Sequence, residues 1–421
     1  MADYLLPSEI ISEIFSRLDP QSLLRFRSTS KSLKSIIDSH NFTNLHLKNS
    51  HNFNLILCHD NTDLYHLHFP NLTITAIPLH YPLPDANSIT LFGSCNGILC
   101  ISSKTEIAFW NPNILKHRII PYLPIPFPQS NSNIKFALSI HGFGFDPFSS
   151  DYKLLRVSWF VEDSTIDSCV RLFTLKTNSW KVLPTVEYDL FSPNAIGVFV
   201  ENSSSLHWIM TRKLDKFHPL LIVAFNLTLE VFNEVPFPAE IGVVSKGRFE
   251  IHVADLGGCL CLIVNYQTTK IDVWVMKEYG CRDSWFKLFT MAESCFNLPL
   301  KSLSPLGYSS DGKKVLLEVN HVLLEVNNVL LEINHKKLVW YDLKNDQVSY
   351  VEGIPNFDEV MICVESLVQP SFPVDNSRKK ENSSSKTERR YFLLIMYKLI
   401  SIQWTHHMLM YLNSYYRTRI L

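Results

Sequence analysis

The stretch LPSEIISEIFSRLDPQSLLRF, residues 6–26, carries the strongest structural signal in this chain of 421 residues. Within it Ile10, Ile14 and Leu18 recur at every fourth position, which is the apolar stripe of an amphipathic helix. Asp19 follows directly and is suited to cap a second helix, whose first position is a proline that needs no N–H partner there. The stretch therefore predicts two consecutive short helices.

A third helix is expected after Ser30, which is placed to cap it, with Leu33, Ile36 and Ile37 as its apolar residues. Three helices of this size bury too little surface to be stable alone. Part of the apolar stripe must therefore face a partner or the rest of the chain. A helical cap on the following domain is the simpler of these two interpretations.

The order and spacing of these elements resemble an F-box. The matching elements are LPSEI (6–10), EIFSRL (13–18), SLLRFR (22–27), SKS (30–32) and Phe42 before LHL (45–47). In that family the helices bind a Skp-type adaptor, which links to a cullin scaffold carrying the ubiquitin-conjugating machinery. The resemblance implies that most of the adaptor contact comes from Leu6, Pro7, Ile10, Ile14, Leu18, Leu23, Leu24 and Phe26.

Two positions depart from the plant form of this pattern, because Thr29 stands where Val is usual and Leu33 where Trp is usual. We expect these departures to weaken adaptor binding. The helices also carry a basic cluster, for which contact with acidic adaptor residues and a solvated helix face are both open interpretations. The cluster consists of Arg25, Arg27, Lys31 and Lys34.

The overall charge is nearly balanced, with 39 Lys and Arg against 40 Asp and Glu, so no net field favours nucleic acid as a partner. The N-terminus lacks the basic start and apolar core of a secretory signal, which predicts a cytoplasmic and/or nuclear protein. In that reducing setting we expect the nine cysteines to be buried thiols. We expect no disulfide framework, zinc site or cofactor, since no C-x-x-C pair occurs.

Residues 50–370 change to short alternating runs broken by Asn, Asp, Pro and Gly, which is typical of antiparallel strands. One unit recurs, namely an apolar strand with an aromatic residue before a polar turn. Its anchors are Tyr65, Trp110, Phe173, Phe225, Trp274 and Tyr341, separated by 45 to 67 residues. Such a spacing is typical of propeller blades.

The longest spacing contains a tandem duplication, since VLLEVNH (315–321) is followed by VLLEVNN (322–328) and VLLEINH (329–335). Because seven is odd, consecutive copies present opposite faces, so all three cannot continue one strand. We expect the extra 14 residues to loop out or to pair as a hairpin. A heptad coiled coil is the disfavoured alternative, because no apolar heptad continues beyond the three copies.

The same region resembles the domain associated with many plant F-boxes, as in S-locus F-box and F-box/kelch-repeat proteins. The matching stretches are GSCNGILC (93–100), FWNP (109–112), HGFGFDP (141–147), DYK (151–153), LHW (206–208) and IDVWVM (271–276). The resemblance implies a kelch-like β-propeller of about six blades that recognises a protein substrate. The expected fold class is thus α+β multidomain, with a three-helix F-box before an all-β propeller.

No stretch of the sequence identifies a catalytic site. Gly142 and Gly144 lack the third glycine and the helix of a phosphate-binding loop, and no G-x-S-x-G elbow occurs. His66 and His68 share one face of a strand, yet no third metal ligand accompanies them, so packed or solvated histidines are the favoured interpretation. We therefore expect a non-catalytic protein without a metal site.

The domain division follows from these patterns: an F-box over residues 1–47, a propeller over 48–370, a disordered linker over 371–390 and an apolar tail over 391–421. The linker is charged and Ser-rich. The tail approaches the length of a membrane span, but Lys398, Gln403 and two histidines interrupt it, which disfavours a membrane anchor.

The predicted function is substrate recognition for an SCF-type (Skp-cullin-F-box) E3 ubiquitin ligase. The predicted partners are a Skp-type adaptor, through it a cullin, and an unidentified target protein. The alternatives are a propeller enzyme or carbohydrate-binding protein with a helical cap, and a degenerate paralogue. The sequence does not indicate the pathway, which includes self-incompatibility, defence and hormone signalling as options, nor the substrate-binding residues or the propeller face that carries them.

Overall fold

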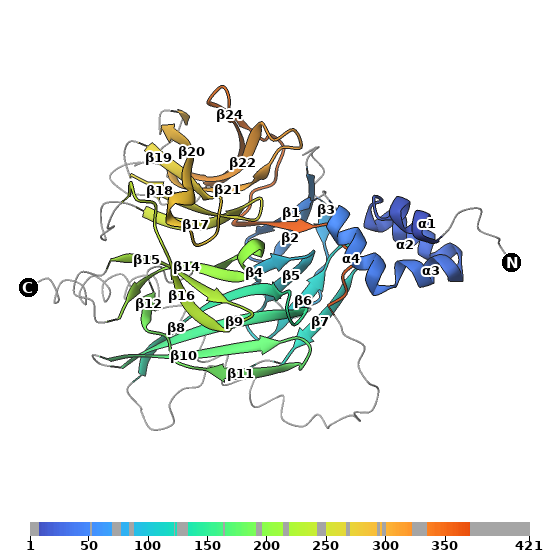
Figure 1. Cartoon of the computed structure of the whole chain (residues 1–421), viewed down its shortest axis with the longest axis horizontal. Coiled ribbons are helices and arrows are strands. Elements are labelled where there is room, and N and C mark those ends of the chain that lie inside the picture. Colours follow the sequence, from blue (N-terminus) through green and yellow to red (C-terminus); the bar gives the residue numbers. More distant parts are fainter. Residues whose placement is uncertain are drawn as a thin grey trace, which may run out of the picture. The chain divides into compact units, whose positions relative to one another are not determined.

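The computed structural model describes residues 8–370, apart from residues 51–52, 70–76, 84–87, 122, 124–133, 163–164, 191–195, 214–218, 242–249, 267–269, 293–294, 297–299 and 322–334. Within these residues the chain begins with four helices and continues in strands (Figure 1). The chain thus has a helical part at its N-terminal end, and the sheets follow it.

The helices are α1 (Ser8–Phe15), α2 (Pro20–Thr29), α3 (Lys31–Ile37) and α4 (His40–Asn49). Asp19 Oδ1 accepts a hydrogen bond of 2.8 Å from Ser22 N, with Pro20 at the first helical position. Ser30 Oγ accepts one of 3.2 Å from Ser32 N. Both caps therefore lie where the sequence predicts them.

The prediction of three helices is wrong, because α4 is a fourth. Its sequence, HNFTNLHLKN, contains few strong helix formers, which is why the pattern did not predict it. Ser39 caps it by accepting a hydrogen bond of 3.2 Å from Phe42 N. Phe42 and His46, one turn apart, are both 2% exposed, so tertiary packing stabilises this helix more than propensity does.

Within the described residues the strands form five hydrogen-bonded sheets, and four of these have four strands each. The first sheet is β25 (Glu359–Val364), β1 (Phe53–His59), β2 (Asp63–Phe69) and β3 (Ile77–Leu79). The second is β4 (Thr90–Cys95), β5 (Ile98–Ser102), β6 (Ile107–Asn111) and β7 (Lys116–Ile120).

Two further four-stranded sheets follow late in the chain. One is β17 (Glu250–Leu256), β18 (Cys259–Asn265), β19 (Lys270–Met276) and β20 (Trp285–Ala292). The other is β21 (Leu300–Tyr308), β22 (Lys314–His321), β23 (His335–Asp342) and β24 (Gln347–Tyr350).

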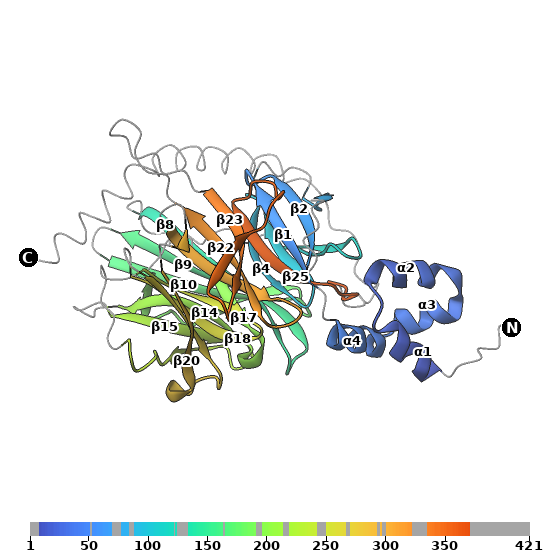
Figure 2. The same cartoon turned by 90° about the horizontal axis from the view of Figure 1, so that it is seen from above.

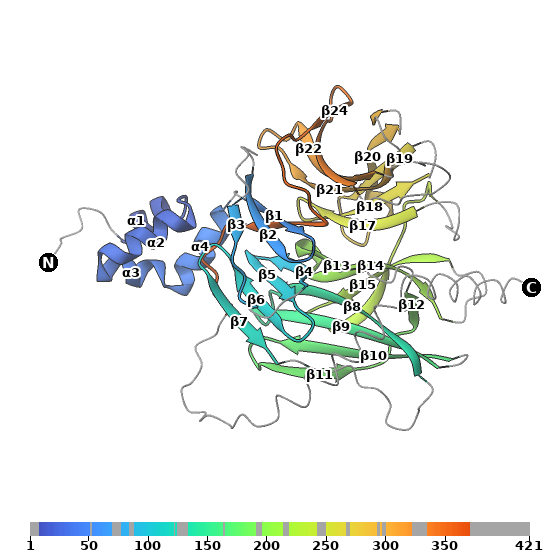
Figure 3. The same ribbon diagram turned by 180° about the vertical axis from the view of Figure 1, so that it is seen from behind.

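The remaining sheet has nine strands and consists of two antiparallel units joined edge to edge (Figure 3). The first unit is β8 (Ile134–Asp146), β9 (Asp151–Glu162), β10 (Thr165–Thr174) and β11 (Ser179–Leu183). The second is β13 (Ile196–Val200), β14 (Ser205–Arg212), β15 (Leu220–Asn226) and β16 (Val231–Val235), with β12 (Tyr188–Leu190) paired to β14.

The units join because β8 and β13 pair in parallel, with His141 opposite Ile196 and Gly142 opposite Gly197. The indole of Trp208 packs against both glycines. A Cβ atom on Gly197 would lie 2.3 Å from Trp208 Cζ2, and one on Gly142 would lie 2.9 Å from the same atom. The two glycines therefore permit this close approach of strand and ring.

The last strand closes the first sheet, because β25 pairs with β1 and places Val364 opposite Phe53 (Figure 2). Repeated antiparallel four-stranded units closed by a C-terminal strand form a β-propeller arrangement. The six aromatic anchors of the sequence all lie on the third strand of such a unit, namely β2, β6, β10, β15, β19 and β23. The predicted repeat thus corresponds to one strand position.

The first copy of the tandem duplication forms most of β22, and His321 at its end pairs with His335 at the start of β23. The second and third copies connect these two strands, and residues 322–334 lie outside the described residues. The prediction that the extra residues loop out or pair as a hairpin concerns this segment and therefore also lies outside the described residues.

The predicted linker and apolar tail, residues 371–421, likewise lie outside the described residues. In the part of the chain that the structure describes, no helix is long and apolar enough to cross a membrane.

Candidate functional site

Helices α1 and α2 expose three large apolar side chains. Ile10 and Ile14 of α1 are 46% and 50% exposed, and Phe26 of α2 is 42% exposed. The Phe26 ring lies 5.1 Å from that of Phe15, which joins the two helices at this point. We call Ile10, Ile14 and Phe26 the helix face. Clustered exposed apolar side chains of this kind mark a protein-binding surface.

The other residues predicted to bind the adaptor are placed differently. Leu18 and Leu24 are half-buried, whereas Leu23 is fully buried at 0% exposure. Leu6 and Pro7 lie outside the described residues. Leu23 therefore supports the helix face from within instead of forming part of its surface.

The interior of the helical part is not made by the helices alone. Its buried apolar cluster consists of Leu23, Ile37 and Phe42, one each from α2, α3 and α4, together with Leu367, which follows β25. Ile114, from the turn between β6 and β7, packs against the same cluster. The propeller thus supplies part of the core on which the helix face rests.

Side-chain hydrogen bonds join α4 to the turn after α1 and, just beyond its end, to the segment after β25. His46 Nε2 donates to Leu18 O at 2.9 Å, and Asn49 Nδ2 donates to Ser16 Oγ at 2.8 Å. Burial lowers the pKa of His46, so its imidazole is neutral at pH 7. Just after α4, Ser50 Oγ donates to Glu365 O at 2.8 Å.

The basic cluster divides into one paired and three exposed residues. Arg27 Nη2 donates to Asp38 Oδ2 at 2.8 Å, which fastens α2 to the end of α3. Arg25, Lys31 and Lys34 are exposed. These three side chains are the ones available to an acidic partner.

The propeller has an end that is remote from the helices. β1 leaves α4 at Phe53 and ends at His59, while β25 begins at Glu359 beside that end and runs back toward the helices. We call this end, with the adjacent residues 60–62, 336–338 and 350–358, the distal face.

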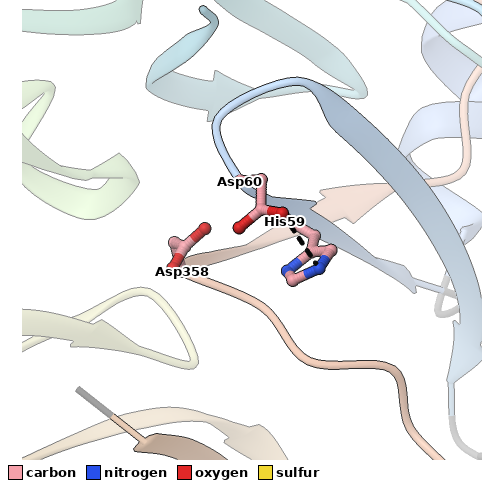
Figure 4. A group of neighbouring side chains, drawn as sticks. All are labelled: His59, Asp60 and Asp358. Carbon is pink, nitrogen blue, oxygen red and sulfur yellow. Dashed lines mark ion pairs between the residues drawn. The ribbon is translucent and has the colours of Figure 1, made fainter. Parts of the chain in front are cut away.

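On the distal face His59, Asp60 and Asp358 lie together (Figure 4), with candidate ligand atoms all within 4.8 Å of one another. His59 Nε2 is 3.5 Å from Asp60 Oδ2, and both aspartates are exposed. No local sequence pattern predicts this group, because Asp358 is almost 300 residues from Asp60. Exposed groups of this kind are common without a metal ion, and we assign it no role.

A pocket of about 100 Å³ also opens on the distal face. Leu338, Ile354 and Phe357 contribute apolar walls, and Lys337 and Glu352 contribute charged groups of opposite sign. Lys336, at its edge, pairs with Glu318 at 2.6 Å. The pocket lies at the strand ends from which the duplicated segment leaves β22 and returns to β23.

Of the two histidines that the sequence singled out, His68 is exposed, and His66 is partly buried with no hydrogen-bond partner for its Nε2 among the described residues. His68 Nδ1 lies 3.2 Å from Asn54 Oδ1 and 3.3 Å from Glu365 Oε1, and burial lowers the pKa of His66. The nine cysteines are free thiols. Five of them are buried, but Cys295 is exposed, so the expectation of buried thiols holds for only part of the set.

Two protein families match this chain. The F-box domain family matches residues 4–45, and the F-box associated beta propeller domain family matches residues 48–370. F-box protein CPR1 of Arabidopsis thaliana is 33% identical over 387 residues, which cover 86% of this chain and 88% of the relative. F-box/kelch-repeat protein At3g23880 of the same plant is 25% identical over 340 residues, covering 74% and 85%.

Among solved structures, an Aleuria aurantia lectin in complex with Fucα1-6GlcNAc is similar at a TM-score of 0.37 and 9% identity, covering 76% of this chain and 93% of the lectin. A likeness this distant bears on no residue of the site. The F-box associated beta propeller domain family matches most of the chain, and CPR1 is similar over most of its own length. These two matches show the family of this chain. This chain belongs to the plant F-box proteins that carry an F-box associated β-propeller domain.

Proposed function

We propose that this protein is the substrate-recognition subunit of an SCF-type E3 ubiquitin ligase, which binds its adaptor through the helix face and a target protein through the propeller. An F-box implies binding of a Skp1-type adaptor, and F-box proteins are typically non-catalytic ligase subunits. The observation that carries the proposal is the exposure of Ile10, Ile14 and Phe26 on helices whose buried cluster includes a residue from the propeller side.

The helix face offers part of the apolar surface that a complex with the adaptor would bury. Burying an Ile or Phe side chain contributes roughly 1.5–3 kcal/mol. Because the three residues are about half exposed, each retains about half of that gain for a partner. Arg25, Lys31 and Lys34 add a positive rim that suits an acidic adaptor.

No catalytic group is needed for this role. A receptor that holds the target close to a charged conjugating enzyme raises the local concentration of a target lysine, and that proximity accelerates transfer. The proposal places the protein in the cytoplasm and/or nucleus, where adaptor, cullin and target would meet it.

We further propose a propeller of six blades, in which the nine-stranded sheet counts as two and β25 completes the first. The six third-strand anchors support this count. The proposed division remains an F-box at residues 1–47, a propeller at 48–370, a linker at 371–390 and a tail at 391–421.

The distal face is the proposed site for the target. It lies at the far ends of β1 and β25, so an adaptor on the helices leaves it free. It also contains a pocket with apolar walls and charges of both signs, next to the end of β22 and the start of β23, which the duplicated segment joins. Loops on a rigid scaffold are where proteins commonly place recognition residues.

The test of the adaptor role is a co-purification of the full chain with a plant Skp-type adaptor. We expect the wild-type chain to bind and an Ile10→Asp/Ile14→Asp double variant to lose binding, since charges would be buried against apolar surface. Phe148→Asp is the matched control, because Phe148 is 88% exposed but lies in the propeller. Equal recovery of adaptor with the double variant and the control would contradict the proposal.

A further inference from the structure

The segment that follows β25, residues 365–368, joins two parts of the molecule. It continues from the strand that closes the propeller and enters the core of the helical part. We call residues 365–368 the strap.

On the propeller side the strap is held by buried hydrogen bonds. Ser366 is fully buried, and its Oγ donates to Asn96 O at 2.7 Å. Asn111 Nδ2 donates to Ser366 O at 3.1 Å and to Val368 O at 2.8 Å. Asn111 is itself fully buried, so these bonds are shielded from water.

The strap also passes very close to the turn between β4 and β5. Gly97 has a φ of +79°, and a Cβ atom there would lie 2.2 Å from Ser366 Oγ and 2.6 Å from Val364 O. Only glycine combines this conformation with this approach. The position of the strap is therefore fixed by the second sheet as well as by β25.

On the helical side the strap contributes one apolar side chain and one carbonyl. Leu367 is 6% exposed and packs in the cluster with Leu23, Ile37 and Phe42. Glu365 O accepts the hydrogen bond from Ser50 Oγ at 2.8 Å. A four-helix unit of this size buries little surface alone, so a core residue from outside it has a large effect on its stability.

We propose that the strap makes adaptor binding conditional on a closed propeller. The core beneath the helix face is complete only when Leu367 is buried in the cluster with residues of α2, α3 and α4. Leu367 reaches that position only when β25 has paired with β1. A receptor whose target-binding domain is incomplete would then be excluded from the ligase. This inference rests on the proposed adaptor role for its functional meaning.

The experiment uses the full chain and measures adaptor affinity by titration calorimetry. Leu367→Asp is expected to lower adaptor affinity about tenfold or more, and Leu367→Met to change it less than about twofold. The decisive variant is Ser366→Ala, which loosens the strap on the propeller side. It is expected to lower adaptor affinity about threefold, although Ser366 contacts Asn96 and Asn111 of the propeller and is not part of the helix face.

Leu229→Asp serves as the control, because Leu229 is 69% exposed on a propeller turn and should leave affinity unchanged. Thermal unfolding of each variant establishes that the propeller remains folded. If Leu367→Asp and Ser366→Ala both bind adaptor as the wild type does, the strap has no coupling role and the inference is overturned.

Limited trypsin digestion provides a readout that does not need the adaptor. Exposed Arg25, Lys31 and Lys34 offer cleavage sites in the helical part. Faster cleavage there in Leu367→Asp and Ser366→Ala, with the propeller still resistant, supports the strap even if no variant binds adaptor. In that case the proposed adaptor role would fail while the coupling stands. Unchanged cleavage would overturn the coupling.

Discussion

Lys153 Nζ lies 2.9 Å from Asp146 Oδ2, and the two side chains are only 5% and 2% exposed. Lys153 also donates to Leu227 O at 2.6 Å and to Glu230 Oε1 at 3.1 Å, while Thr228 Oγ1 donates to Asp146 Oδ1 at 2.7 Å. Burial alone would raise the pKa of Asp146, but hydrogen bonds from Ser149, Thr228 and Lys153, with the charge of Lys153, outweigh it and hold the pKa at about 2. The ion pair itself lies within the first unit of the nine-stranded sheet, and its contacts with Leu227, Thr228 and Glu230 join that unit to the second.

Replacing Lys153 by Met should destabilise the propeller by about 3–5 kcal/mol, because the change leaves the Asp146 carboxylate buried without its counter-ion. Lys181→Met is the matched control. Lys181 pairs with Glu230 of the same network but is 46% exposed, so its loss should cost less than about 1 kcal/mol. Urea unfolding at pH 7 measures both changes, and equal losses would refute the distinction.

Asp255 predicts a pH dependence of stability. Burial, with a smaller contribution from Glu201, raises its pKa to about 7, and Oδ1 has no hydrogen-bond partner among the described residues. A carboxyl whose folded pKa is raised stabilises the fold below its unfolded pKa, and this contribution is lost as pH rises toward 7.

Asp255→Asn should therefore be more stable than the wild type at pH 8, by on the order of 2 kcal/mol, and lose this advantage near pH 4. Thermal unfolding between pH 4 and pH 8 provides the measurement. A difference that does not change with pH would show that the carboxyl is not the titrating group.

Gly197→Ala should destabilise the protein by about 1–3 kcal/mol, because the new methyl group would overlap the Trp208 ring. Gly307→Ala is the control, since the nearest atom to a Cβ there is Ile362 Cδ1 at 3.5 Å, an ordinary contact. Guanidinium unfolding followed by tryptophan fluorescence compares the two. The expectation fails if Gly197→Ala is as stable as the control.

Deleting residues 322–335 should leave the propeller intact. The remaining strands keep their pairing from Lys314 with Asp342 to Val319 with Lys337, joined by the three residues Asn320, His321 and Lys336. Three-residue hairpin connections are common. We expect a Tm within about 4 °C of the wild type, a shift of roughly 3 kcal/mol for a chain of this size. A large drop would instead give the duplicated copies a structural role.

The helical part was predictable where a local pattern decides the structure. Asp19 and Ser30 cap helices as their sequence neighbours indicate, because capping depends on residues two or three positions away. Helix α4 was not predictable in the same way, since Phe42 and His46 are stabilised by contacts that only the assembled fold provides.

For the candidate site too, local sequence patterns do not predict contacts between distant residues. The apolar stripe predicts that Ile14 and Leu23 are both covered, but not by what. The structure leaves Ile14 half exposed and buries Leu23 against Leu367, which is 344 positions away in the chain. Likewise the parallel pairing of β8 with β13 depends on Gly142 and Gly197, whose joint role has no signal in either segment alone.

The pairing of β1 with β25 has a consequence for the synthesis of this protein. About 300 residues separate the end of β1 from the start of β25, and at ~5–20 residues per second the ribosome needs ~15–60 s to produce them. Throughout that interval the nascent chain carries a first sheet with an unoccupied inner edge, and such edges invite pairing with other chains. Chaperones that shield exposed strands on the ribosome should therefore determine how much of this protein reaches its folded state.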